Sequence, residues 1–180
     1  MLKWNKLGKI FDPTCYSKHN WLNDFAQCTS TLIRENYIRI YFSCRPKIDS
    51  NGQYVSYTSF VDFDRNDMTK IIRLADSPIL ELGELGTFDE FGIYPSSIIE
   101  VNSKVYFYYA GWTRMSSVFA NVAIGLAISE DGGTTFNRIG LGPIMSRTFN
   151  EPFQVSGPKV RFFDGVFYMF YISGEKWILN

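Results

Sequence analysis

Acidic side chains precede three similar segments of this chain at nearly constant distances of five to seven residues. The acids are Asp24, Asp89 and Glu151, and the segments begin at Thr29, Pro95 and Pro158. Two carboxyl groups around one glycosidic bond can cleave it, because one protonates the leaving oxygen while the other acts as base or nucleophile. If the segments converge in the fold, the three acids are candidates for catalysis of glycosyl transfer. The alternative is structural, because loop acids commonly cap turns or pair with basic residues.

Further polar and aromatic side chains near the ends of the same segments are candidates for substrate binding. They are Arg45, Glu90, Tyr94, Trp112 and Arg147, and Arg114 stands beside Trp112 at the same strand end. An arginine can hold a carboxylate or phosphate through two parallel hydrogen bonds. Its alternative role is to pair with the loop acids. Trp112 could serve as a platform for a sugar ring, or it could pack between neighbouring sheets.

The three segments share one pattern: an apolar run, a turn with Asn or Asp-Gly, and an aromatic run. The turns fall at Asn36, Asn102 and Asp164, which are 66 and 62 residues apart. A second marker, Pro-Ile, occurs at Pro78 and again 65 residues later at Pro143. A period of this length, with several short strands and no helical pattern, is typical of β-propeller blades. The sequence therefore predicts an all-β fold of the β-propeller type.

The repeat predicts one partial propeller domain over residues 1–180, with about 2.5–3 four-stranded blades. The expected units are 24–77, 78–142 and 143–180, after a leading segment 1–23 that contains a strand at 8–13. A closed propeller needs at least about four blades. The sequence thus predicts either a fragment or truncated chain, or copies that self-associate by pairing their open blade edges.

The segment Ser129–Phe136 carries Ser, Asp, Gly, Thr and Phe at positions 1, 3, 5, 7 and 8. This spacing matches the Asp-box turn of sialidases and other propellers. Asp131 is expected to cap a tight turn in which a glycine adopts positive φ, with Phe136 packed beneath it. The predicted role is structural, and sialidase-like chemistry would further require a tyrosine nucleophile and a cluster of arginines.

Composition excludes several classes of function. With 18 basic and 18 acidic residues the formal net charge is +0, which provides no electrostatic footprint for nucleic acid or an anionic membrane. The aromatic fraction of 17% fits β-strands and also a carbohydrate partner. No apolar run approaches the length of a membrane-spanning helix. The single histidine, His19, argues against a zinc site built from histidines and against a Ser-His-Asp triad, and we expect no metal and no cofactor.

The first residues lack the apolar stretch of a secretory signal, which predicts a cytoplasmic protein. Three cysteines, Cys15, Cys28 and Cys44, are odd in number and form no Cys-x-x-Cys pair. We therefore expect free, mostly buried thiols in a reducing compartment.

Six stretches together resemble a known superfamily. They are residues 38–45, 78–80, 86–96, 108–112, 123–133 and 142–152. They are similar to predicted glycosidases of the five-bladed propeller superfamily, which includes arabinanases, xylosidases, fructosidases and mannoside phosphorylases. The resemblance covers nearly the whole chain. It implies a five-bladed fold, a carbohydrate substrate, and glycoside hydrolase or glycoside phosphorylase activity.

The chain departs from the arabinanase-like subgroup at two positions. Those members carry Ala-Asp-Pro where this chain has Ala26-Gln27-Cys28, and Glu-Gly-Pro where it has Ser156-Gly157-Pro158. Their mechanism therefore cannot be transferred. Mannoside phosphorylases need one protein acid because phosphate is the nucleophile, and Asp89 with Arg45 and Arg147 near an anion would suit that scheme.

Two hypotheses of different classes remain from the sequence. One is a glycosidase-like enzyme that truncation could leave inactive, and the other is a non-catalytic sugar-binding or assembly module. Placement of Asp89 and Glu151 in one pocket, within about 10 Å of each other, would favour catalysis. Separate surroundings would favour the second hypothesis.

Overall fold

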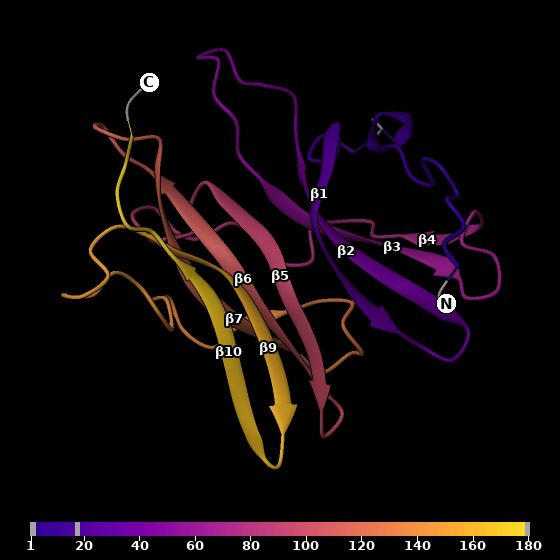
Figure 1. Ribbon diagram of the computed structural model, residues 1–180. Coiled ribbons are helices and arrows are strands. Elements are labelled where there is room, and N and C mark those ends of the chain that lie inside the picture. The colour runs from indigo at the N-terminus through magenta and orange to yellow at the C-terminus, as the bar shows by residue number, and fades with distance from the viewer. Residues whose placement is uncertain (1–2, 17–18, 179–180) are drawn as a thin grey trace.

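The structure is a computed structural model that describes residues 3–16 and 19–178, and it is all-β (Figure 1). The first sheet has the order β1(Asp24–Ile33), β2(Tyr37–Arg45), β3(Tyr57–Asp64), β4(Ile71–Leu74). The second has the order β5(Gly92–Val101), β6(Lys104–Arg114), β7(Ala120–Ser129), β8(Asn137–Arg138). The third pairs β9(Val155–Phe163) with β10(Val166–Ser173). All pairings within these sheets are antiparallel, which is consistent with part of a β-propeller.

The three predicted aromatic hairpins are present as β1–β2, β5–β6 and β9–β10. Two of them close through residues with positive φ, at Asn102-Ser103 and Asp164-Gly165. Such two-residue turns match the twist of the flanking strands. The prediction of a strand at residues 8–13 is wrong, because the described residues before β1 form only a short 3-10 helix, η1(Pro13–Tyr16).

One strand from each sheet, β1, β5 and β9, lies against its counterpart in the next sheet. Hydrogen bonds join them: the backbone N–H of Ile98 donates to Ser30 Oγ at 3.2 Å, and that of Val160 donates to Ser97 Oγ at 3.0 Å. In Figure 1 the second sheet stands between the first sheet and the β9–β10 hairpin. This arrangement brings the starts of three equivalent strands to one end of the molecule.

The predicted Asp-box turn is confirmed and fastens the second sheet to the first. Asp131 Oδ1 accepts hydrogen bonds from Ser129 Oγ and from the N–H groups of Thr134 and Thr135. Partial burial by itself would raise the pKa of Asp131, but the bonds from Ser129 and Thr135 outweigh it and lower the pKa to about 2. The following Gly133, at φ 89°, accepts a hydrogen bond from the buried Tyr41 hydroxyl at 2.8 Å.

The third sheet differs from the other two because one of its faces and one edge are uncovered. In the first two sheets the aromatic strands β2 and β6 are paired on both sides. In the described residues β10 pairs only with β9, and large side chains such as Phe170 and Ile172 are 69% and 63% exposed. An unpaired apolar strand edge is a template for pairing with further chain.

The expectation of mostly buried cysteines is wrong: Cys44 is buried, whereas Cys15 and Cys28 are exposed. Burial raises the pKa of the Cys44 thiol. Within the residues described, no helix has the length and apolar character needed to cross a membrane.

Candidate functional site

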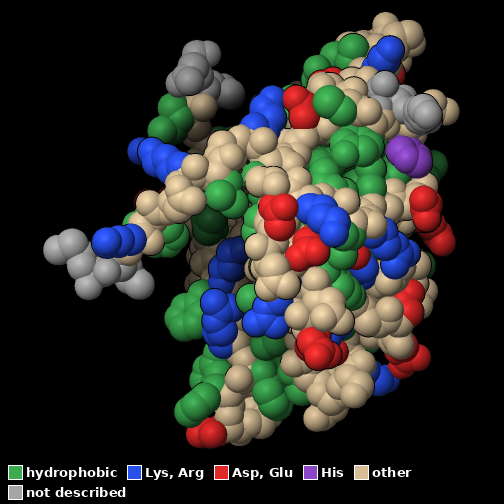
Figure 2. Space-filling view, turned by 90° about the vertical axis from the view of Figure 1, so that its right-hand side faces the viewer, with side chains coloured by type: hydrophobic (Ala, Val, Ile, Leu, Met, Phe, Trp, Pro, Cys, Tyr) green, Lys and Arg blue, Asp and Glu red, His purple; other side chains and the backbone are tan. Residues whose placement is uncertain are grey.

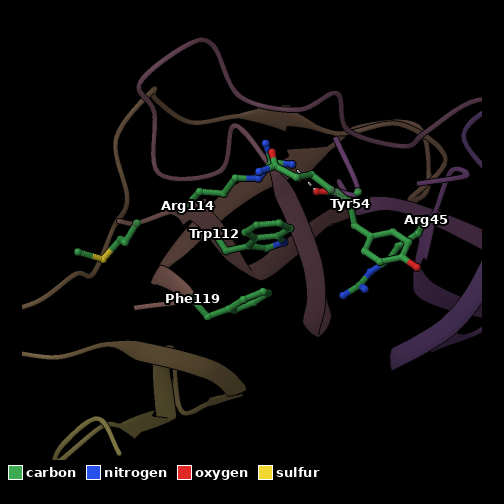
Figure 3. Close-up of a pocket in the computed structure, with 8 residues that line it drawn as sticks. Arg45, Tyr54, Trp112, Arg114 and Phe119 are labelled. Atoms are coloured by element: carbon green, nitrogen blue, oxygen red, sulfur yellow. Dashed lines mark hydrogen bonds between the residues drawn. The ribbon is translucent and has the colours of Figure 1, made fainter. Parts of the chain in front are cut away.

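A cavity of about 580 Å³ opens beside the ends of β2 and β6 (Figure 3). We call it the arginine–aromatic cavity. It is lined by Arg45, Gly52, Gln53, Tyr54, Trp112, Arg114, Met115 and Phe119. Arg45 ends β2, β6 supplies Trp112 and its last residue Arg114, and the loops that follow these two strands supply the remaining wall. Equivalent strands of two sheets therefore bring two arginines to the same opening.

Arg45 lies between two aromatic rings on one side of the cavity. Its Cζ is 4.8 Å from the ring centroid of Phe25 and 4.9 Å from that of Tyr54. Its Nη2 donates to the hydroxyl of Tyr94 at 3.0 Å, and its buried Nε has no hydrogen-bond partner. Cation–π contacts hold a guanidinium in place without neutralising its charge.

The beginning of β1 is distorted where it supports Arg45. Phe25 and Cys28 have φ values of 65° and 54°, although neither is glycine, and the register of β1 on β2 shifts twice between Asp24 and Ser30. Such bulges redirect side chains at the rims of sheets and next to functional sites. Here the bulge accompanies the placement of the Phe25 ring against Arg45. Positive φ at a bulky residue is unfavourable and persists only where the surroundings impose it.

Trp112 and Arg114 form the opposite side of the cavity. Trp112 is 5% exposed as a residue, and its ring stacks on Phe119 with centroids 6.0 Å apart and planes inclined by 21°. Its Nε1 has no partner and lies so close to Gly92 that a Cβ there would stand 1.7 Å from it. The Cζ of Arg114 lies 3.9 Å from the ring centroid of Phe91, and its Nη2 donates to the Tyr54 carbonyl at 2.7 Å. Figure 3 shows the Trp112 and Phe119 rings facing Tyr54 and Arg45 across the opening.

Glu90, a predicted substrate-binding residue, is not among the lining residues and instead ties its loop to β6. Its carboxylate accepts hydrogen bonds from the Gly86 N–H at 2.7 Å and the Thr113 hydroxyl at 2.6 Å. The bond from Gly86 is the main cause that lowers the pKa of Glu90, and the charge of Arg114 adds to it. Glu90 is therefore a carboxylate at neutral pH.

Asp89 lies away from the arginine–aromatic cavity, in a buried ion pair. Only 1% of the residue is exposed, and its Oδ2 is 2.8–2.9 Å from Nη2 and Nε of Arg138 and from the Tyr109 hydroxyl. Its Oδ1 accepts from Thr87 at 3.2 Å. Both oxygens are thus occupied by donors of the protein. This geometry matches the structural alternative for a loop acid, and a catalytic role for Asp89 stays a prediction.

The other two acids occupy different surroundings. Asp24, the first residue of β1, pairs in register with Arg45 and accepts a hydrogen bond from Asn23 Nδ2 at 2.5 Å. Glu151 is half-buried in the loop before β9 and accepts from the Tyr171 hydroxyl at 3.2 Å. Arg147, four residues earlier, is exposed.

Of the predicted site residues, the structure brings together Arg45, Tyr94 and Trp112. Asp89 and Glu151 have separate surroundings, and Asp24 lies beside Arg45 along the backbone only. The sequence prediction missed Tyr54 and Phe119. Arg114, noted beside Trp112 at the same strand end, follows it by two residues, which is the spacing of side chains on one face of a strand. Tyr54 and Phe119 lie in irregular loops, where no period reveals which side chains meet.

No protein-family model matches this sequence. Two curated relatives, the uncharacterized proteins Rv1502 and MT1551 of two Mycobacterium tuberculosis strains, are each 33% identical over 177 residues. The match includes 98% of this chain and 56% of each relative. The chain therefore spans little more than half the length of the curated relatives it matches.

Several solved glycoside hydrolases share the fold. A structure reported for the GH130 family of mannoside phosphorylases, with glycoside hydrolases that target beta-1,2 mannosidic linkages in Candida mannan, matches with a TM-score of 0.63 and 10% identity. A glycosyl hydrolase from Bacteroides ovatus matches with a TM-score of 0.62 and 12% identity. Both alignments cover 84% of this chain and 44% of the other. Zg3597, a family 117 glycoside hydrolase of Zobellia galactanivorans, has a TM-score of 0.58 and 16% identity, covering 85% and 44% of the two chains.

These matches confirm, at the level of the fold, the predicted resemblance to propeller glycosidases. At 10–16% identity they establish the fold alone. The function of the chain has to be argued from its own residues.

Proposed function

We propose that this chain is part of a carbohydrate-active propeller enzyme and that the arginine–aromatic cavity holds the sugar. The observation that carries this proposal is the cavity itself, which combines stacked aromatic rings with two arginines in a fold shared with glycoside hydrolases. Sugar rings present apolar faces that pack on aromatic side chains, and their hydroxyl oxygens accept hydrogen bonds from arginine. A volume of about 580 Å³ lies within the usual range for small-molecule sites.

The proposed reaction is cleavage of a glycosidic bond by hydrolysis or phosphorolysis. A carboxylic acid donates its proton to the glycosidic oxygen, the bond from that oxygen to the anomeric carbon breaks, and water or phosphate attacks that carbon. Of the predicted acids, Asp24 is nearest to the cavity along the backbone, because it pairs with Arg45. Glu151 lies at the corresponding place before β9. Asp89 would have to leave Arg138 before it could act.

A second candidate function is non-catalytic sugar binding. It is favoured by the composition of the cavity wall, because no Asp or Glu is among the residues that line the cavity in the described part of the chain. An enzyme of this type needs at least one acid at the bond that is cleaved.

A screen with aryl glycosides, with and without phosphate, combined with calorimetric sugar titrations, separates these functions. The enzyme proposal predicts turnover that Asp24→Asn abolishes while sugar affinity is retained. Asp67→Asn, which alters an exposed turn acid on the far end of β3, serves as the control. Sugar binding without turnover would support the non-catalytic function, and absence of both would contradict the proposal.

We further propose a five-bladed propeller in which the open edge of β10 pairs with a strand of a second copy. The uncovered aromatic face of the β9–β10 hairpin supports this, since the equivalent strands β2 and β6 are paired on both sides. Light scattering should show a mass that rises with concentration, and Phe170→Lys should reduce the rise. A monomer at every concentration would contradict self-association.

A further inference from the structure

The arginines of this chain fall into two groups by their partners. Arg34, Arg39 and Arg138 form ion pairs with Glu100, Asp62 and Asp89. The other arginines form no ion pair with any carboxylate of the described residues; they are Arg45, Arg65, Arg73, Arg114, Arg147 and Arg161, of which Arg45 and Arg114 line the arginine–aromatic cavity. On the face shown in Figure 2 basic and acidic side chains are interspersed, as expected for a chain with 18 of each. Two arginines outside any ion pair of the described residues therefore line one cavity, and Glu90 lies close enough to Arg114 for that charge to lower its pKa.

Aromatic rings and neutral oxygens hold both guanidinium groups in place without an ion pair. Arg45 contacts two rings and one hydroxyl, and its buried Nε still lacks an acceptor. Arg114 contacts one ring and one carbonyl oxygen. A buried N–H without a partner is unfavourable, and a ligand oxygen would remove that penalty. An ionised acceptor would be bound most tightly, because charge-assisted hydrogen bonds from arginine are stronger than those to a neutral acceptor.

The rest of the cavity wall indicates which kind of ligand would carry the negative charge that the arginines bind. Trp112, Phe119 and Met115 provide an aromatic and apolar side, and the cavity has room for far more than a small inorganic anion. A ligand that fits both halves has a ring with an apolar face and one negatively charged substituent. We infer that the sugar bound in the arginine–aromatic cavity is acidic, with a ring carboxylate placed between Arg45 and Arg114. This inference rests on the proposed sugar-binding function and narrows its substrate class to uronate-containing glycans.

The test compares acidic sugars with uncharged versions of the same sugars. Short oligosaccharides of galacturonate, glucuronate and mannuronate, and their methyl esters, are titrated into the chain by calorimetry at low salt. For at least one sugar, the acid should bind about tenfold or more tightly than its ester, because the ester cannot form the charge-assisted hydrogen bonds. Added NaCl should reduce this preference.

Arginine variants locate the preference. Arg114→Met should lower the affinity for the acid by about tenfold while changing that for the ester little. Arg45→Lys keeps the positive charge but removes the planar guanidinium with its paired donors. It should therefore also lower the affinity for the acidic sugar more than the affinity for its ester. Arg73→Met is the matched control, because Arg73 is an exposed arginine of the outer strand β4 that also lies over an aromatic ring, that of Phe60 at 5.3 Å.

The possible failures are distinguishable. Equal affinity for acids and esters, or a preference unaffected by both cavity variants, would overturn the acidic-sugar inference and leave the sugar-binding function standing. Binding of inorganic phosphate that competes with the acid but not with its ester, at an affinity equal to that of the acid, would overturn the inference in favour of a free-anion site. If no sugar bound at all, neutral ones included, both the inference and the proposed function would be wrong.

Discussion

Arg39 and Arg45 stand on the same strand, β2, yet their surroundings are opposite. Arg39 is 2% exposed, and its Nε and Nη2 each meet Asp62 on the neighbouring strand at 2.7 Å. Its Nη1 also reaches Thr134 of the second sheet at 3.2 Å. Arg39 and Arg45 both lie over aromatic rings, but Arg45 donates only to the Tyr94 hydroxyl and forms no ion pair within the described residues. A guanidinium whose donors are occupied by a buried carboxylate has none left for a ligand. The partner of an arginine therefore separates a structural role from a binding role better than its position along the repeat.

The largest effect is expected when these two arginines are replaced in turn by methionine. Arg39→Met leaves the buried Asp62 without its partner and should lower the free energy of unfolding by about 3–5 kcal/mol. Arg45→Met should cost about 1–2 kcal/mol, because it removes cation–π contacts and one hydrogen bond to the Tyr94 hydroxyl, and it also removes the buried Nε that has no partner. Urea denaturation of both variants measures the difference. Equal losses would remove the proposed distinction between the two arginines.

Asp89→Asn should cause a similar loss of folding stability, because it leaves Arg138 facing a neutral side chain. We expect a decrease of about 3 kcal/mol in the free energy of unfolding, since a mostly buried charge loses its partner. Asp67→Asn, at an exposed turn, should stay within about 0.5 kcal/mol of the parent. A stable Asp89→Asn protein that had lost glycoside turnover would instead support Asp89 as a catalytic acid.

A smaller effect tests the packing behind the cavity. A Cβ at Gly92 would stand 1.7 Å from Trp112 Nε1, so Gly92→Ala should displace the indole and cost about 1–3 kcal/mol. It should also shift the tryptophan fluorescence and weaken sugar binding. Gly140→Ala is the matched control, because nothing lies within 4 Å of a Cβ at that position. An unchanged emission spectrum for Gly92→Ala would show that Trp112 is not held as described.

The smallest expected effect is a loss of folding stability at low pH, which depends on Asp131. The pKa of Asp131 is lowered from 3.8 to about 2, so its contribution to stability is complete above about pH 4 and is lost as the pH falls toward 2. Because Asp131 is exposed to solvent, we expect this contribution to be no more than about 1 kcal/mol. Thermal unfolding of the parent and of Asp131→Asn between pH 6 and pH 2, at about half-unit steps, should show the two stabilities converging in acid. If the stabilities of the two proteins differed by the same amount at every pH, Asp131 would not be the group whose protonation lowers stability in acid.

The features that were predictable from the sequence have local causes. The turns at Asn102 and Asp164 and the Asp-box around Asp131 follow from side chains that bond to, or permit, their own backbone. The repeat period then indicates the order of the sheets. Arg45 and Trp112 could be predicted as site residues because they lie at or near the ends of strands in that repeat.

The remainder of the candidate site depends on contacts between distant parts of the chain. The environment of Asp89 is decided by Arg138, which lies 49 residues further along. The left-handed backbone of Phe25 is imposed by a bulge at the rim of the first sheet and has no signal in the residue type. Tyr54 reaches the cavity from an irregular loop. The sequence also could not show that Asp89 is already paired with a basic side chain in the fold.

The most direct test of the central claim observes the indole N–H of Trp112 by NMR during a sugar titration. The chain has four tryptophans, so the indole region is simple, and Trp112→Phe assigns the resonance. We predict that the Trp112 signal moves progressively on addition of the tightest-binding sugar, and that it moves much less in Arg45→Met. Sugar binding that shifts other tryptophan signals and leaves that of Trp112 unchanged would contradict the claim that the arginine–aromatic cavity is the carbohydrate site.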